Sequence, residues 1–376
     1  MDFDYVVMPA IILALGVLVI CVCIFRMRSL RTKSYRLQRK VAEGIVFSLI
    51  VLLSVAVAGS SSFNAIAIHH FWAMNPPAGQ MVAVDGHKMH IDCTGNGSPT
   101  LVLEAGGGND SLIWRGVQPE LSKTTRVCSY DRAGFGWSDA VPGSRDADHV
   151  AGDLHQLLLQ TGITGPIVLM GHSIAGVYMR DYATRYPQNV VGIVFVDAST
   201  PLQDQNAAME AGGKGPPAWF LRSALILGVP RLIGMCSRPT QGAAGHTRKL
   251  QAEDICRIHF SAMSAELDSF HQSGEQTIHS GPYGALPVLI LSHDPSKLPP
   301  KQKPTQQSIK RQNAWSQMQE DLKKLSTRSG RIIAKGSTHN VTLDRADLIE
   351  KEVPLFIDQI RGIAPQPINY GFTITE

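Results

Sequence analysis

The sequence predicts an α/β fold in which helices cover both faces of a mostly parallel sheet. Three observations lead to this prediction. Short runs such as 190–196 and 287–291 are continuously apolar, as in strands that are buried on both faces. Patterns typical of amphipathic helices separate these runs, and such alternation builds a parallel sheet. Two long apolar stretches come before this pattern and predict two transmembrane helices ahead of the α/β domain.

The alternating pattern runs over residues 79–362. Asp85-Gly86 favours a tight turn between the first two strands, and Gly162 is placed to end the first helix. We expect strands at 81–84, 88–93, 100–103, 126–130, 166–170, 190–196, 287–291 and 331–334. Helices are expected at about 150–158, 315–325 and 348–360, and another after the serine corner described below is expected to end before Pro187.

Residues 201–280 interrupt this alternation. The segment is rich in glycine and proline at first and helical in pattern later, so we predict a helical lid inserted above the sheet. Residues 365–376 lack a comparable pattern and are predicted to be a flexible tail. The α/β domain therefore comprises residues 73–364, after a membrane anchor at 1–72.

The anchor contains apolar stretches at about 5–25 and 45–68, each close to the roughly 20 residues that cross a bilayer as a helix. Between them, residues 26–40 are basic and contain no acid. A basic loop of this kind stays in the cytoplasm, so two spans place the following domain on the extracytoplasmic side. No basic residue precedes the first stretch, which indicates a retained anchor rather than a signal peptide.

Two alternatives to this topology stay open. The second stretch contains Ser60, Ser61 and Ser62, and if it is too polar to span, the domain is cytoplasmic with one anchor. Ala56-Val57-Ala58 resembles a processing site, and cleavage after Ala58 would release the domain.

Composition excludes some classes of function. The net charge is +4 and its excess is local, whereas a nucleic-acid-binding domain presents a basic face. No histidine, cysteine or acid cluster has metal-ligand spacing, and no Gly-x-Gly-x-x-Gly follows the first strand of a βαβ unit. We therefore predict no nucleic-acid partner, no metal and no cofactor.

A serine lies between an expected strand and an expected helix, in the sequence Gly171-His172-Ser173-Ile174-Ala175-Gly176. A strand-to-helix corner of this kind lifts the serine oxygen clear of the backbone at the carboxyl edge of the sheet. The usual pattern has glycine at the fifth position, where this chain has the similarly small Ala175. Ser173 is the candidate nucleophile.

Four motifs make the chain resemble the α/β-hydrolase superfamily over residues 79–362. They are Leu103–Gly108, Tyr130–Asp139, the serine corner and Gly336–Asn340. The Asp131–Asp139 part is the most specific of them. The chain is similar to the branch that contains small esterases, proline iminopeptidases, perhydrolases and carbon–carbon bond hydrolases. That resemblance implies hydrolase chemistry and names no substrate.

A serine nucleophile needs a base and an acid that orients the base. His339 follows the last strand and is the candidate base. Asp294 follows the strand 287–291 and is the acid that we favour, although the family more often places the acid where this chain has Ser296. Asp197, at the end of the preceding strand, is the alternative acid.

The oxyanion of an acyl-transfer intermediate needs two backbone N–H donors. One is expected from Ile174, directly after the nucleophile. The resemblance implies the other from the loop after the third strand, where relatives have His-Gly-x and this chain has Ala105-Gly106-Gly107, so Gly107 is the candidate. His172 and His293 adjoin the site and are expected to pack or line it.

These features predict a membrane-anchored serine hydrolase that acts on a small-molecule acyl substrate, most simply an ester, through an acyl-enzyme. An acyltransferase, an iminopeptidase-like peptidase and a non-catalytic membrane binding protein remain alternatives. The peptidase would need lid acids to bind a substrate amine, and the candidates are Glu210, Glu253, Asp254, Glu266 and Asp268. In an oxidising compartment, Cys93–Cys128 and Cys236–Cys256 could be disulfides. The oligomeric state is not predicted.

Overall fold

The computed structural model describes residues 3–201, 203–209, 216–237, 245–257, 259–298, 304–363 and 372–376. The chain forms two compact units. One comprises Met1–Pro76, Gly215–Pro239 and Ala252–Ile258, and the other comprises Pro77–Lys214, Thr240–Gln251 and His259–Glu376. The second unit contains every residue that the sequence predicts for the site.

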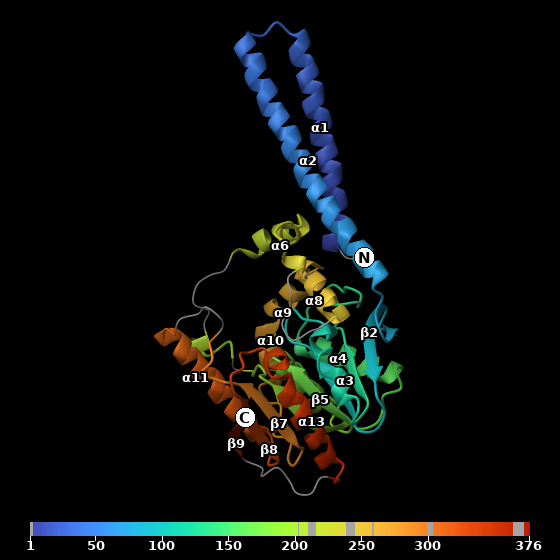
Figure 1. Ribbon diagram of the computed structural model, residues 1–376, viewed down its shortest axis with the longest axis vertical. Coiled ribbons are helices and arrows are strands. Elements are labelled where there is room, and N and C mark those ends of the chain that lie inside the picture. Colours follow the sequence, from blue (N-terminus) through green and yellow to red (C-terminus); the bar gives the residue numbers. More distant parts are fainter. Residues whose placement is uncertain are drawn as a thin grey trace. The chain divides into compact units, whose positions relative to one another are not determined.

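The second unit is built on a single sheet with the strand order β1-β2-β4-β3-β5-β6-β7-β8-β9 (Figure 1). The strands are β1 Gln80–Val84, β2 His87–Thr94, β3 Thr100–Glu104, β4 Val127–Tyr130, β5 Ile167–His172, β6 Val190–Val196, β7 Val288–His293, β8 Ser329–Ala334 and β9 Thr373–Thr375. The β1–β2 and β2–β4 pairs are antiparallel, and the other neighbours are parallel. The predicted mostly parallel sheet is confirmed.

Helices cover both faces of this sheet because side chains alternate between faces along each central strand. On one face, Leu169 of β5 belongs to a core to which α4 (Ala147–Gln160) and α5 (Ala175–Arg185) contribute. On the other face, Val168 of β5 belongs to a core shared with α13 (Ala346–Ile360). The continuously apolar runs in the sequence follow from this two-sided burial.

The remaining helices join the strands or lie between β6 and β7. The short α3 (Gln118–Leu121) precedes β4, α11 (Gln306–Asp321) precedes β8, and α12 (Val341–Asp344) precedes α13. The helices between β6 and β7 are α6 Ala218–Ile226, α7 Val229–Leu232, α8 Gly245–Arg257, α9 Phe260–Asp268 and α10 Phe270–Thr277. They occupy the segment where the sequence predicts a helical insertion, whose glycine-rich part at 210–215 lies outside the described residues.

The predicted flexible tail is wrong for its last residues. Thr373–Thr375 form β9, which pairs in parallel with β8 at the edge of the sheet. An uncovered edge strand exposes unpaired backbone groups, and this short strand satisfies those of β8. Its β-branched residues also suit a strand. Residues 365–371 of the predicted tail lie outside the described residues.

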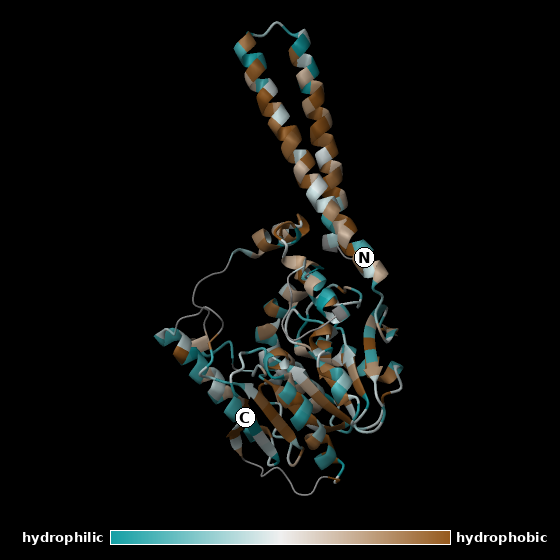
Figure 2. Cartoon of the chain, in the orientation of Figure 1, coloured by the Kyte–Doolittle hydropathy of each residue, from teal (hydrophilic) through white to brown (hydrophobic). Residues whose placement is uncertain are grey.

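The other unit contains two long apolar helices, α1 (Met8–Thr32) and α2 (Leu37–Met74), preceded by the short helical segment Phe3–Val7. Both are long and apolar enough to cross a membrane, and Figure 2 shows that hydrophobic residues predominate along them. The predicted 26–40 loop is shorter than expected, because the helices extend into it and leave 33–36 as the connection. Arginine, lysine and leucine are good helix formers, which explains the extension.

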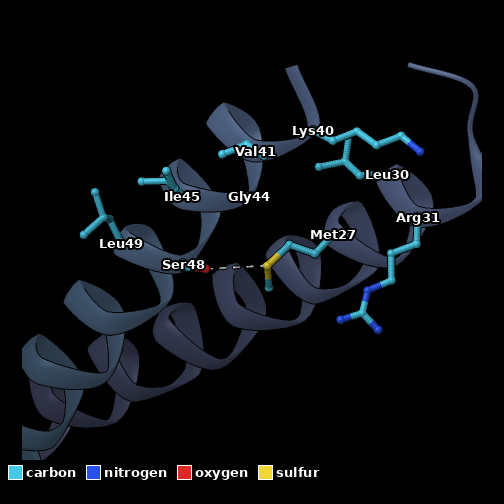
Figure 3. A pocket seen from close by; sticks show the side chains of 9 residues that line it. All are labelled: Met27, Leu30, Arg31, Lys40, Val41, Gly44, Ile45, Ser48 and Leu49. Carbon is cyan, nitrogen blue, oxygen red and sulfur yellow. Dashed lines mark hydrogen bonds between the residues drawn. The ribbon is translucent and has the colours of Figure 1, made fainter. Parts of the chain in front are cut away.

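A pocket lies between α1 and α2 close to this connection (Figure 3). Arg31 and Lys40 are its basic residues, and Ser48 Oγ lies 4.0 Å from Met27 Sδ across the two helices. The other residues that line it are Leu30, Val41, Gly44, Ile45 and Leu49. The pocket contains none of the predicted site residues, which belong to the unit of the sheet.

Both cysteine pairs that the sequence offered as disulfides are joined. Cys93 of β2 lies directly opposite Cys128 of β4 in the strand register and is bonded to it. Cys236 and Cys256 are bonded within the first unit. Cys21 and Cys23 are free thiols of α1.

Reducing these bonds is expected to change both thiol reactivity and stability. Alkylation of the denatured, unreduced chain should modify Cys21 and Cys23 alone, and prior reduction should expose the four other cysteines, as intact-mass analysis would measure. The double variant Cys93→Ala/Cys128→Ala should lose about 2–4 kcal/mol of unfolding free energy, the usual effect of opening a loop of this size. Complete alkylation without reduction would contradict the pairing.

Candidate active site

Ser173 occupies the corner between β5 and α5, with a φ of +57° that residues other than glycine rarely adopt. The corner is crowded. A Cβ on Gly171 would lie 2.6 Å from the Ala175 Cβ, and a Cβ on Gly176 would lie 2.3 Å from the Ser199 carbonyl oxygen. Glycine is therefore required at 171 and 176, while the alanine at 175 fits the motif position that is more often glycine.

Two hydrogen bonds connect Ser173 to a histidine and an acid. His339 Nε2 lies 3.0 Å from Ser173 Oγ, and His339 Nδ1 lies 2.6 Å from Asp197 Oδ2. An ionised carboxylate can only accept, so Nδ1 carries the proton and Nε2 presents its lone pair to the serine hydroxyl. This tautomer is the one in which imidazole can take the serine proton.

The structure corrects our choice of acid: Asp197, the alternative, contacts His339, and the favoured Asp294 does not. Asp294 Oδ1 accepts from the Ser296 N–H at 2.9 Å and from the Ser296 hydroxyl at 2.6 Å, and Oδ2 accepts from the Gly336 N–H at 2.9 Å. Asp294 thus stabilises the loops after β7 and β8. Asp197 directly follows β6, and β6 pairs with β5, the strand that leads to Ser173. The carboxylate of Asp197 therefore starts from the strand next to the serine corner.

Asp197 is fully buried and is held by further donors. His293 Nδ1 lies 2.8 Å from Oδ2, the His293 N–H donates to Oδ1 at 3.0 Å, and Trp315 Nε1 donates to Oδ1 at 2.9 Å. Burial by itself raises the pKa of Asp197, but the bonds to His293 and His339 more than reverse this and leave the pKa well below its usual value. Asp197 is therefore ionised at neutral pH.

His293 is the second histidine that is hydrogen-bonded to the Asp197 carboxylate. Burial lowers the pKa of His293, but the hydrogen bond and the charge of Asp197 outweigh it and raise the pKa above its usual value. Its other nitrogen, Nε2, lies 2.5 Å from Gln312 Oε1 on α11. His293 is thus bonded at both ring nitrogens, which fixes the ring against the Asp197 carboxylate.

The sequence analysis predicts no metal, yet the structure brings together potential ligand atoms within 4.8 Å of one another, from Asp197, His293 and His339. Both histidines direct Nδ1 at the carboxylate at hydrogen-bond distances of 2.6 and 2.8 Å. A nitrogen that donates a proton has no lone pair for a metal ion. The two Nδ1 atoms that face the carboxylate are therefore occupied as hydrogen-bond donors.

The loop after β3 lies against the serine corner. A Cβ on Gly107 would lie 3.5 Å from Ile174 Cγ2, and a Cβ on Gly106 would lie 2.7 Å from His172 Nδ1. Among the described residues, neither the Gly107 N–H nor the Ile174 N–H donates a hydrogen bond. The two amides predicted to bind an oxyanion are thus neighbours with their donors unused.

His172 supports the loop that carries His339. Its Nε2 lies 2.8 Å from the His339 carbonyl oxygen, so Nε2 is the protonated nitrogen of a neutral ring. Burial, and to a lesser degree the charge of His339, lowers the pKa of His172 to about 4. The residue expected to pack or line the site is therefore a neutral donor that positions the His339 backbone.

A buried arginine fixes the backbone of the predicted oxyanion loop. Arg132 donates from Nη1 to the Ala105 carbonyl at 2.7 Å and from Nη2 to the Gly106 carbonyl at 2.8 Å. It also forms ion pairs of 2.6 Å with Glu104 and with Glu266 of α9. Burial lowers the pKa of Arg132, but the charges of Glu266 and Glu104 reverse this and raise it well above its usual value.

Glu266 connects the insertion to the same loop through a second bond. Its Oε2 accepts from the Gly108 N–H at 3.2 Å, while its Oε1 binds Arg132. Gly108 has a φ of +71°, and a Cβ there would lie 3.2 Å from Met263 Sδ of α9. The conformation of the loop after β3 therefore depends on α9 as well as on β4.

In the sequence, Arg132 was recognised only as part of the Tyr130–Asp139 motif. The hydrogen bonds and ion pairs of Arg132, Glu104, His293 and Trp315 within the site were not predicted. The motif itself contained the signal, because a charged pair directly after a buried strand must find partners. Its other member, Asp131, accepts from His90 Nδ1 at 2.8 Å. The motif is therefore a structural support of the site.

Comparisons with known proteins agree with the fold described above. A family model described as the alpha/beta hydrolase fold matches residues 99–230. An uncharacterized protein of Schizosaccharomyces pombe is 30% identical over 75% of this chain and 56% of its own length, and one of Bacillus subtilis is 31% identical over 41% of this chain and 50% of its own. The chain spans about half the length of these curated relatives.

Among solved structures, a haloalkane dehalogenase loop variant from Bradyrhizobium elkanii matches with a TM-score of 0.55 and 17% identity, covering 75% of this chain and 97% of that one. At this identity the match concerns the fold alone. The family model and this structural match agree on the fold: the chain has the α/β-hydrolase fold.

A matched pair of variants distinguishes the two acids. Asp197→Asn should lower the turnover of any substrate by about 10,000-fold, because the orienting carboxylate of a serine–histidine pair has an effect of this size. Asp294→Asn changes the same group at the end of the neighbouring strand and should leave turnover close to wild type. Steady-state kinetics on folded proteins would measure both, and a larger loss for Asp294→Asn would restore our first choice.

The Arg132 cluster predicts a large difference between two glutamates. Glu266→Gln should lower the unfolding free energy by about 1.5–3 kcal/mol, the usual value of a hydrogen bond to a charged group. Glu120→Gln removes an exposed pair with Lys123 and should cost less than about 1 kcal/mol. Denaturant unfolding would compare them, and equal losses would show that the buried pair contributes no more than the exposed one.

Proposed function

We propose that this protein is a membrane-anchored serine hydrolase that cleaves an ester or a related acyl bond through an acyl-enzyme. The observation that carries the proposal is the hydrogen-bonded series Ser173–His339–Asp197 on a strained corner at the carboxyl edge of the sheet. A serine hydroxyl is a weak nucleophile on its own, and a neighbouring base that is held in one tautomer activates it.

Each group has a role in the proposed reaction. Ser173 Oγ attacks the acyl carbon as its proton moves to His339 Nε2, and Asp197 stabilises the imidazolium while remaining ionised. The N–H groups of Gly107 and Ile174 bind the oxyanion of the tetrahedral intermediate. His339 then donates the proton to the leaving alcohol, and water, activated by the same nitrogen, hydrolyses the acyl-enzyme.

Two of the candidate lid acids already have arginine partners and so give the peptidase alternative no support. Glu266 is paired with Arg132, and Glu253 is paired with Arg231. A carboxylate that already neutralises an arginine is poorly placed to bind a substrate amine as well. Glu210 lies outside the described residues.

Membrane anchorage is part of the proposal, with the catalytic domain on the extracytoplasmic side. The two apolar helices and the basic connection between them support two spans with that orientation. The two disulfides support the same side, because such bonds persist in oxidising compartments and are rare in the cytosol. The substrate is a small molecule, and its identity is a matter for a substrate screen.

A fluorophosphonate probe tests the activated serine without knowledge of the substrate. The full-length chain in detergent should be labelled on Ser173, because the probe reacts with a serine whose proton a neighbouring base removes. Ser173→Ala and His339→Ala should both abolish labelling, as in-gel fluorescence and peptide mapping would measure.

A matched control is Ser296→Ala, which removes another hydroxyl close to the carboxyl edge and should leave labelling unchanged. The absence of labelling in a folded wild-type protein would contradict the proposal and favour a non-catalytic binding protein. Labelling that persists in His339→Ala would contradict the role of the base.

A further inference from the structure

The first unit contains an exposed apolar face that its described residues leave uncovered. It lies on α6 and α7, where Trp219 is 69% exposed and Leu232 is 66% exposed, and Figure 2 shows the hydrophobic character of α6. The exposed apolar residues of this face are Trp219, Phe220, Leu221, Val229, Leu232 and Ile233. A contiguous apolar surface of this kind marks a contact with a partner or a membrane.

The same two helices are bonded to the apolar helix α2. Ser60 Oγ donates to the Leu227 carbonyl at 2.5 Å, and Asn64 Nδ2 donates to the Leu225 carbonyl at 3.0 Å. These carbonyls belong to the C-terminal end of α6, where a helix leaves its last acceptors without intrahelical partners. Away from water such groups must be satisfied within the protein, and the side chains of α2 do this.

Further contacts fix this attachment. Arg231 Nε donates to Asn64 Oδ1 at 3.0 Å, and its guanidinium is paired with Glu253. Gly228 has a φ of +71°, and a Cβ there would lie 2.7 Å from the Asn64 Cβ, so α2 and the turn between α6 and α7 are in close contact. Asn64 is itself 2% exposed, and both its amide nitrogen and its amide oxygen form hydrogen bonds with the insertion.

The packing of α1 on α2 gives the depth of this attachment. A Cβ on Gly16 would lie 3.2 Å from the Ala58 Cβ, and Met27 contacts Ser48. Continued along the antiparallel pair, this register places Ser60 and Asn64 beside about residues 10–14 of α1. Those residues belong to the uninterrupted apolar run of α1, roughly 8–13 Å from its start at Tyr5 at about 1.5 Å per residue.

We propose that the exposed face of α6 and α7 is seated in the interfacial layer of the same bilayer that α1 and α2 span, in the leaflet at the N-terminal end of α1. The inference rests on the membrane anchorage proposed above. Interfacial helices bury their apolar face about 5–10 Å into the boundary between headgroups and acyl chains, which matches the depth of Asn64. A tryptophan at this boundary is typical.

The test measures the depth of Trp219 in the full-length chain reconstituted into phosphatidylcholine vesicles. The signal of Trp219 is the difference in fluorescence between wild type and Trp219→Phe. Phospholipids brominated close to the headgroup should quench this signal and those brominated at the chain end should quench it less, while aqueous iodide should have little effect.

A second probe separates this inference from the anchorage on which it depends. Leu18→Trp in the Trp219→Phe background places a tryptophan at an exposed position in the middle of α1, where lipids brominated at the chain end should quench it most. If Leu18→Trp is quenched and Trp219 is not, the anchorage holds and the seating of α6 and α7 is overturned. If neither probe is quenched by lipid, both proposals fail.

The remaining outcomes identify a different occupant of the face. Quenching of Trp219 by iodide alone would show that the face lies in water. Protection of Trp219 from both iodide and brominated lipid, together with cross-linked dimers, would show that a second copy of the chain covers it. Each of these results would overturn the proposal.

Discussion

Asp197 brings a negative charge into the interior at the end of β6, and the arrangement around Ser173 depends on how that charge is satisfied. The Nδ1 atoms of His339 and His293, the Nε1 of Trp315 and the backbone N–H of His293 all donate to its oxygens. A buried carboxylate without such donors would be protonated or would destabilise the fold. With them, the charge fixes the tautomer of His339 and so the lone pair that faces Ser173.

A second buried charge has the corresponding function on the other side of the serine. Arg132 fixes the carbonyl groups of the loop after β3, and Glu104 and Glu266 compensate its charge. Because Glu266 belongs to α9, the insertion contributes to the geometry of the loop that we expect to bind the oxyanion. Replacing a whole buried pair by apolar groups often costs little stability, whereas removing one partner is costly. The value of these pairs here is that they define the position of backbone N–H groups.

The helices of the insertion are divided between the two units. The helices α9 and α10 belong to the unit of the sheet, whereas α6 and α7 belong to the unit of α1 and α2. Ser60, one of the serines that made the second apolar stretch look too polar to span, binds α6 together with Asn64. Their polarity in an apolar helix is therefore explained by tertiary contacts rather than by exposure to water.

The sequence by itself determined the α/β class, the serine corner, the two apolar helices and the identity of Ser173 and His339, because periodicity and short motifs are local properties. Tertiary structure alone decided the acid, since Asp294 and Asp197 follow adjacent strands and only the packing of β6, β7 and α11 shows which carboxylate faces His339. It also decided the roles of Arg132 and Glu266, which are separated by 134 residues in the chain. Long-range ion pairs and strand-edge contacts such as that of β9 have no local signature, so a single sequence could not predict them.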